Sequence, residues 1–152
     1  WNVLGNSLPA LGMLILIIFF PEYSFLLELA FFGAISAALA DTLSSEIGYY
    51  SKKPPVMITT FKVVKKGIDG GITLLGELAA LFGGIVIGVI YFFAYQNIFG
   101  ALLVIIAGLV GSNVDSVFGG FFETKKLLDK TQVNLIGSFS GAVFCILLGL
   151  LI

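Results

Sequence analysis

Histidine and arginine are both missing from the 152-residue chain, since its eight basic residues are all lysines. Without histidine, this segment has no imidazole for acid–base catalysis or for a metal site. Without arginine, no guanidinium group can clamp a phosphate, so any anion must be held by lysine, backbone N–H groups or a metal ion. The single cysteine, Cys145, has no partner for an internal disulfide, and we expect it to be a buried small hydrophobic residue.

Charge is also scarce. Charged residues make up 11% of the chain, against about 25% in a typical soluble domain, while 59% of the residues are hydrophobic and the mean hydropathy is +1.10. This composition predicts an all-α, multi-pass helical protein of the cell membrane. We interpret residues 1–152 as a single transmembrane domain, and the start at Trp1 instead of Met leaves room for N-terminal helices that this segment lacks.

Apolar runs predict about five transmembrane helices, because a span needs about 20 predominantly apolar residues. Pro21 ends the first run, and Pro54 and Pro55 follow the second. The expected helices cover residues 3–20, 24–50, 72–95, 99–122 and 134–152. They leave two polar loops, at residues 51–71 and 123–133.

All the lysines lie in these two loops, which fall on the same side of the membrane when five spans are threaded. The turns on the opposite side carry no basic residue. Because cytoplasmic loops carry an excess of lysine and arginine, both lysine-rich loops are predicted to be cytoplasmic. The simplest alternative is that the lysines only set this topology.

Carboxylates gather at the same membrane face. Asp41 and Glu46 end the second expected helix, and Asp115 lies inside the fourth. Ionisable groups at membrane depth are costly and usually mark a function, and Mg²⁺ prefers carboxylate oxygens together with substrate phosphates. We therefore predict a Mg²⁺ site with Asp41, Glu46 and Asp115 as ligands. Alternatively, Asp115 is neutral and hydrogen-bonded to a neighbouring helix.

The first polar loop supplies groups that suit a phosphate. Lys62 and Lys66 carry positive charge, and Gly70 and Gly71 are expected to offer free N–H donors at the start of the third helix. Asp69 is either part of this site or only an N-cap. Small polar residues beside the carboxylates support phosphate binding, with hydrogen bonding between helices as the alternative. They are Thr42, Ser44, Ser45, Thr59, Thr60, Ser112, Asn113 and Ser116.

Three segments, ADTLSSEIG, ITTFKVVKKGIDGGITLLG and GLVGSNVDSVFGG, resemble an integral-membrane family whose plant branch includes phytyl-phosphate kinase. The resemblance covers about residues 6–142. It implies site positions at Asp41, Ser44, Ser45, Glu46, Thr59, Thr60, Lys62, Gly67, Gly70, Gly71, Asp115, Ser116 and Gly119, with Asn6 and Asn134 as further polar positions. The chain departs from the family at Glu123, where Gln is common, and at Ile68 and Asp69, where Thr, Ser or Asn are common.

The family also resembles, distantly, CTP-dependent polyprenol kinases and CDP-lipid synthases. The resemblance therefore implies a membrane kinase that transfers a phosphoryl group from CTP, or another nucleoside triphosphate, to an isoprenoid monophosphate with Mg²⁺. Lys62 and Lys66 would neutralise the transferring phosphate. The expected partners are the nucleotide, the prenyl phosphate and the lipid bilayer, with no nucleic acid. A cytidylyltransferase that makes a CDP-lipid, and an ion or solute transporter, remain the alternatives.

Overall fold

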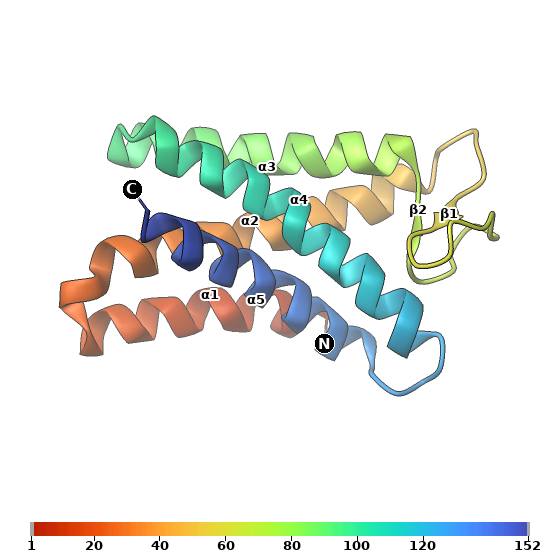
Figure 1. The fold of residues 1–152 in the computed structure, drawn as a ribbon, viewed down its shortest axis with the longest axis horizontal. Coiled ribbons are helices and arrows are strands. Elements are labelled where there is room, and N and C mark those ends of the chain that lie inside the picture. Colours follow the sequence, from red (N-terminus) through yellow and green to blue (C-terminus); the bar gives the residue numbers. More distant parts are fainter. Residues whose placement is uncertain (1, 152) are drawn as a thin grey trace.

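The computed structural model describes residues 2–151, which form a bundle of helices with one small β-hairpin at its end (Figure 1). The elements in chain order are α1 (Asn2–Phe19), a 3₁₀ turn η1 (Pro21–Tyr23), α2 (Ser24–Gly48), β1 (Val56–Met57), β2 (Gly71–Ile72), α3 (Leu74–Tyr95), α4 (Ile98–Phe118), a π-helical turn η2 (Gly119–Glu123) and α5 (Lys130–Gly149). The predicted all-α membrane fold is confirmed.

Four helical segments within residues 2–151 are long and apolar enough to cross a membrane. They are Pro21–Gly48, Leu74–Tyr95, Ile98–Glu123 and Lys130–Gly149. The first helix, α1, is apolar but shorter, at 18 residues. At a rise of about 1.5 Å per residue, 18 residues extend about 27 Å, slightly less than the roughly 30 Å hydrocarbon core of a bilayer.

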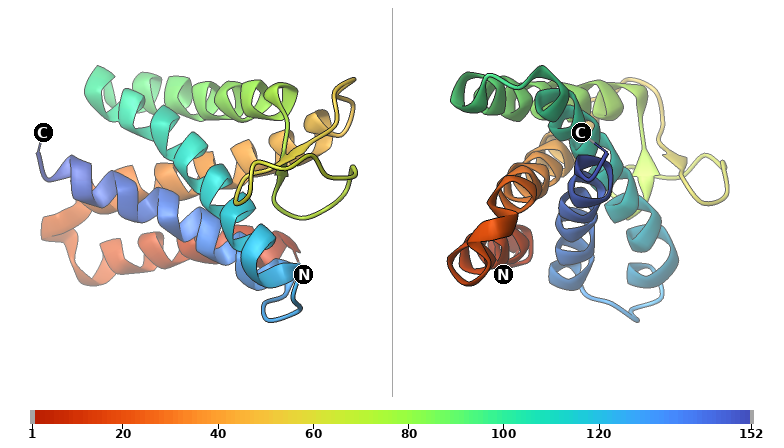
Figure 2. Two further views of the ribbon diagram at one scale, coloured as in Figure 1. Left: turned by 45° about the vertical axis from the view of Figure 1, so that its right-hand side comes forward. Right: turned by 60° about the vertical axis from the view of Figure 1, so that its left-hand side comes forward.

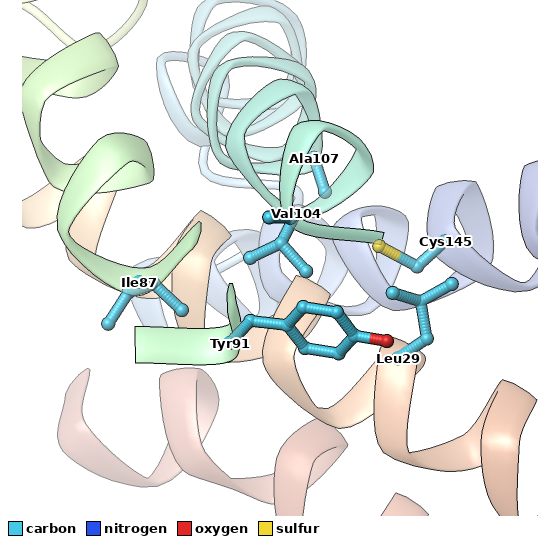
Figure 3. Close-up of a cluster of buried hydrophobic side chains, with 7 residues drawn as sticks. Leu29, Ile87, Tyr91, Val104, Ala107 and Cys145 are labelled. Atoms are coloured by element: carbon cyan, nitrogen blue, oxygen red, sulfur yellow. The ribbon is translucent and has the colours of Figure 1, made fainter. Parts of the chain in front are cut away.

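Helix α2 is the centre of the bundle, since it packs against α1, α3, α4 and α5. The main apolar core forms between α2, α3, α4 and α5, and Figure 3 shows its side chains pointing toward one another. Leu29, Tyr91 and Val104 are almost fully buried there. Cys145 is also buried in this cluster and is a free thiol, as the sequence predicted.

Small residues let the helices approach closely. A methyl group on Gly33 of α2 would lie 2.6 Å from the carbonyl oxygen of Gly141 in α5, so a larger residue would force the helices apart. Ser36 of α2 donates a hydrogen bond to the carbonyl of Val104 in α4, with a distance of 2.7 Å. Close contact between backbones and such hydrogen bonds hold helices together where lipid provides no hydrophobic driving force.

Both polar loops lie at the same end of the bundle (Figures 1 and 2). In the first loop, β1 and β2 pair in antiparallel fashion, with Val56 opposite Ile72 and Met57 opposite Gly71. The second loop follows η2 and leads into α5.

Expected helix boundaries at this end differ from the structure, since α2 ends at Gly48 and not at residue 50, and α4 ends at Phe118 and not at residue 122. Two further differences have a clear cause in helix capping. The third helix begins at Leu74 and not at residue 72, because the side chain of Thr73 caps it by accepting a hydrogen bond from the N–H of Gly76. The last helix begins at Lys130 and not at residue 134, because Asp129 and Gln132 form a reciprocal capping box.

Candidate functional site

The polar end of the bundle contains a pocket of about 240 Å³ between α2, α4, the start of α5 and the first polar loop. Its first wall is the last part of α2. Asp41, Ser44, Ser45 and Gly48 all line it. These positions are spaced by three and four residues, which places them on one face of a helix. Asp41 is only 8% exposed, so this carboxyl group lies at the inner end of that face.

The second wall is the end of α4, which contributes Asp115 and Ser116, followed by Gly119 at the start of η2. Asp115 is 4% exposed. It lines the pocket together with Asp41, across the contact between α2 and α4. Two buried carboxylates that line one pocket repel each other unless they share a proton or a cation. The pocket therefore has a strong preference for positive charge at its base.

Helix α5 provides part of that charge. The Nζ atom of Lys130 lies 3.3 Å from Oδ1 of Asp115. With its amide oriented to satisfy both neighbours, Asn134 donates from Nδ2 to Oδ2 of Asp115 at 3.1 Å and to the carbonyl of Lys130 at 3.2 Å. Each oxygen of Asp115 therefore has a partner on α5. The carboxyl group is held in one orientation, facing the pocket and Asp41.

The first polar loop forms the roof of the pocket, with Lys66, Gly67, Asp69, Gly70 and Gly71 among the lining residues. Gly70 has a φ of +81°, and a methyl group at this position would lie 2.6 Å from the Cα atom of Gly120. Only glycine therefore allows the loop to lie against the end of α4. The N–H of Ile58 donates to the carbonyl of Gly70 at 2.9 Å, which ties this contact to the β-hairpin.

Lys66 also holds the loop to the end of α2. Its ammonium group donates to the carbonyl of Tyr49 at 2.9 Å and to that of Ser51 at 2.6 Å, and it lies 5.6 Å from the centre of the Tyr49 ring. A cation at a helix C-terminus is stabilised by the helix dipole and by unsatisfied carbonyls. In this arrangement Lys66 lines the pocket and also fixes the loop above it.

The structure brings together most of the residues proposed from the sequence. The pocket is lined by Asp41, Ser44, Ser45, Lys66, Gly67, Asp69, Gly70, Gly71, Asp115 and Ser116. Within residues 2–151, the hydroxyl groups of Ser44, Ser45 and Ser116 make no hydrogen bond to protein, whereas buried Ser36 and Ser138 each donate to a helix carbonyl. The serines of the pocket are thus free to bind a ligand.

Other proposed residues lie outside the pocket. Glu46 is exposed and follows Asp41 by five positions, which turns it about 140° around α2, away from the other carboxylates. Lys62, Thr59 and Thr60 belong to the hairpin turn beyond the roof. Their proposed roles stay predictions that this geometry does not support.

Two asparagines are also displaced from the pocket. Asn113 donates to Oε2 of Glu77 at 3.1 Å, so it links α4 to α3. The carboxyl group of Glu77, near the start of α3, therefore has its partner within the bundle. Asn6 lies in α1, which packs against α2 and α5, and it is not among the residues that line the pocket.

The expectation that Gly70 and Gly71 open a helix was wrong. Gly71 belongs to β2, and its N–H donates to the carbonyl of Ile68 at 3.1 Å, so it is not a free donor at a helix start. Asp69 is not the N-cap of α3, since Thr73 takes that position. The side chain of Asp69 lines the pocket instead.

Lys130 is the main pocket residue that the sequence analysis does not propose. The apolar pattern places it in the second polar loop, because it predicts that α5 starts four residues later. A signal was present, however, in the pattern DKTQ. Asp129 and Gln132 match a capping box, which makes Lys130 the first residue of a helix. A cation is unfavourable at that end of a helix dipole, and the ion pair with Asp115 offsets this cost.

The donor set fits a divalent cation that is held jointly by protein and ligand. Among residues 2–151, no three His, Cys, Asp or Glu side chains lie close enough to hold a metal ion by themselves. Mg²⁺ commonly binds through one or two carboxylates, with phosphates and water completing the octahedron. Asp41 and Asp115 match that requirement, and Glu46 does not come near them.

Residues 1–142 match the family described as integral membrane protein DUF92. An uncharacterized membrane protein of Methanocaldococcus jannaschii is 37% identical over 147 residues, which cover 97% of this chain and 60% of the relative. Protein PGR of Arabidopsis thaliana is 41% identical over 103 residues, covering 60% of this chain and 36% of the relative. Protein VTE6, chloroplastic, from the same plant is 31% identical over 130 residues, covering 83% of this chain and 39% of the relative. No solved structure matches the chain significantly.

Proposed function

Because the chain belongs to the integral membrane protein family DUF92, we propose that it forms the site of a membrane phosphotransferase. The enzyme would transfer a phosphoryl group from CTP, or another nucleoside triphosphate, to an isoprenoid monophosphate. The chain spans 60% of the Methanocaldococcus jannaschii relative and 39% of the plant protein VTE6, so the activity is proposed for the whole protein. One observation carries the proposal: two buried carboxyl groups, from α2 and α4, line one polar pocket together with a lysine that pairs with one of them.

The reaction would proceed without an imidazole base. A phosphate oxygen of the isoprenoid monophosphate would attack the γ-phosphorus of the nucleotide, and the bond from that phosphorus to the bridging oxygen would break. The products are an isoprenoid diphosphate and a nucleoside diphosphate. Catalysis of this kind rests mainly on positioning and on stabilising negative charge, so the absence of histidine is no obstacle.

Residues of the pocket would divide these tasks. Asp41 and Asp115 would hold Mg²⁺, which neutralises phosphate charge when it is bound. Lys130 is 36% exposed while it pairs with Asp115, so its ammonium group can contact a phosphate without leaving the carboxylate. The free hydroxyls of Ser44, Ser45 and Ser116 would donate hydrogen bonds to phosphate oxygens.

The isoprenoid tail needs little recognition of its own, since the bilayer dissolves it. The pocket lies at the end of the helices that cross the membrane, where a lipid phosphate from the bilayer and a nucleotide from water can meet. Acidic residues of the pocket gather at this one end, which favours chemistry at a membrane surface over a transport pathway through the bundle.

The test is binding and product analysis with the purified full-length protein in detergent. We expect CTP or ATP to bind only with Mg²⁺, and Asp115→Asn to abolish this binding. With a prenyl monophosphate present, release of a nucleoside diphosphate would identify the kinase. Release of pyrophosphate would instead assign a cytidylyltransferase. Absence of nucleotide binding by a folded wild-type protein would refute both reactions and direct attention to ion-flux assays in liposomes.

A further inference from the structure

The first polar loop, which contains the β-hairpin above the pocket, carries lysines that form no ion pair with a carboxylate within residues 2–151. Between Glu46 and Asp69 the chain has five lysines and no carboxylate. Lys66 is tied to the end of α2, but Lys52, Lys53, Lys62 and Lys65 are exposed. Within residues 2–151, the one ion pair is that of Lys130 with Asp115, so these four lysines have no internal counter-charge.

Apolar side chains are exposed on the same hairpin. Phe61 is 82% exposed and Val63 is 66% exposed. The turn holds Phe61 at a φ of +55°, a left-handed conformation that is unfavourable for a bulky residue. It is stabilised by hydrogen bonds from the N–H of Phe61 to the carbonyl of Met57, at 2.8 Å, and from the N–H of Met57 to the carbonyl of Lys62, at 2.9 Å. The turn thus bears a conformational cost to present an aromatic ring outward, which is typical of a functional site.

The hairpin is placed where a bilayer surface must lie. It connects two candidate membrane spans, Pro21–Gly48 and Leu74–Tyr95. Figures 1 and 2 show it at the end of the bundle, projecting to one side of the helices. Aromatic residues are enriched at membrane–water interfaces, and lysines near such a surface are attracted to anionic lipids. Tyr50, at the end of α2, adds a further exposed aromatic ring at this level.

We propose that residues 52–65 form a docking element for anionic lipid headgroups. Phe61 and Val63 enter the apolar edge of the bilayer, and Lys52, Lys53, Lys62 and Lys65 bind lipid phosphates. This inference does not depend on the chemistry of the pocket. It has a consequence for that site, however, because the same loop continues into Gly67 and Gly70 of the roof. The lipid surface therefore determines how the roof is held over the pocket.

Spin labelling of the full-length protein tests the proposal directly. The label is placed at Phe61→Cys in a Cys145→Ala background, because Cys145 is the chain's single cysteine. The protein is reconstituted in nanodiscs of phosphatidylcholine, with or without phosphatidylglycerol. Power saturation then measures how often the label collides with oxygen, which prefers the bilayer, and with a water-soluble nickel chelate.

We expect phosphatidylglycerol to cause a several-fold loss of collisions with the nickel chelate and a gain of collisions with oxygen. Substituting Gln for the four exposed lysines should remove this difference. A label at Leu127→Cys is the matched control, since Leu127 is exposed in the other polar loop, where lysines and carboxylates are mixed. Its accessibility should not depend on lipid charge.

Two outcomes would overturn the proposal. Equal, high accessibility of the Phe61→Cys label to the nickel chelate in both lipids would place the hairpin in water. A label that is inaccessible to both reagents in either lipid would show that the hairpin packs on protein, either on the pocket itself or on a soluble partner. Proteolysis at the loop lysines with and without label verifies that the hairpin remains folded in the labelled variants that keep these lysines.

Discussion

The Nζ atom of Lys130 lies 3.3 Å from Oδ1 of Asp115, which joins the first residue of α5 to the last turns of α4 at the base of the pocket. Asp115 is 4% exposed, whereas the Lys130 side chain keeps contact with solvent. Loss of the ion pair would therefore cost more for Asp115, which would become a buried unpaired carboxylate, than for Lys130, which would remain solvated.

Removing the lysine should destabilise the protein through that buried carboxylate. We expect Lys130→Met to lower the free energy of unfolding by about 1–2 kcal/mol, less than for a fully buried pair because Lys130 is partly solvated. The double variant with Asp115→Asn should recover most of the loss. Thermal unfolding in detergent measures both. Lys62→Met, which removes an exposed lysine, is the control, and an equal loss in that variant would show that the ion pair has no special role.

The carboxylates should differ sharply in their effect on ligand binding. We expect Asp41→Asn and Asp115→Asn to weaken Mg²⁺-dependent nucleotide binding by about 100-fold or more, because each removes charge from the base of the pocket. Glu46→Gln should change it less than about twofold, since Glu46 faces away from the pair. Calorimetric titration with CTP and Mg²⁺ measures the nucleotide affinity of each variant. A large loss in Glu46→Gln would mean that α2 turns in the functional state.

Asn134 should act through the orientation of Asp115. Asn134→Leu conserves volume but removes the hydrogen bond to Oδ2, and we expect about a tenfold loss of nucleotide affinity, equivalent to about 1.4 kcal/mol. Asn113→Leu is the matched control, because Asn113 bonds Glu77 away from the pocket. That variant should lose stability and keep its affinity. If both variants lose affinity alike, the effect of Asn134 is one of general stability.

Alanine substitutions at two glycines of the roof can distinguish the cost of backbone strain from the cost of a steric clash. Gly67 and Gly70 both have positive φ, at +83° and +81°, but a methyl group on Gly67 would meet no atom within 4 Å. We expect Gly67→Ala to cost about 1 kcal/mol from strain alone. Gly70→Ala should cost more, because its methyl group would collide with Gly120 and lift the loop. If the loop is displaced from Gly120, a lysine-specific protease should cleave within residues 52–66 faster in Gly70→Ala than in Gly67→Ala. Equal cleavage of both variants would contradict the docking of Gly70 on Gly120.

Much of the fold follows from local patterns. The apolar runs were sufficient to predict helices because a chain in lipid must satisfy its backbone hydrogen bonds within each segment. The position of Asp41, Ser44, Ser45 and Gly48 on one face of α2 also follows from a local pattern, their spacing of three and four residues. The exclusion of Glu46 from that face was also accessible from its five-residue offset, although both the gathering of carboxylates at one membrane face and the family resemblance placed it in the site.

Other features depend on contacts between distant segments, which no local pattern contains. The sequence by itself determined a helical membrane protein with all its lysines and most of its carboxylates at one end, since hydrophobicity and backbone hydrogen bonding act within each run. Only the tertiary structure decided that Asp115 meets both Asp41 and Lys130, and that Gly70 belongs to a roof over them and not to a helix start. Those relationships arise from how α2, α4 and α5 pack, and packing depends on the shapes of all their surfaces together.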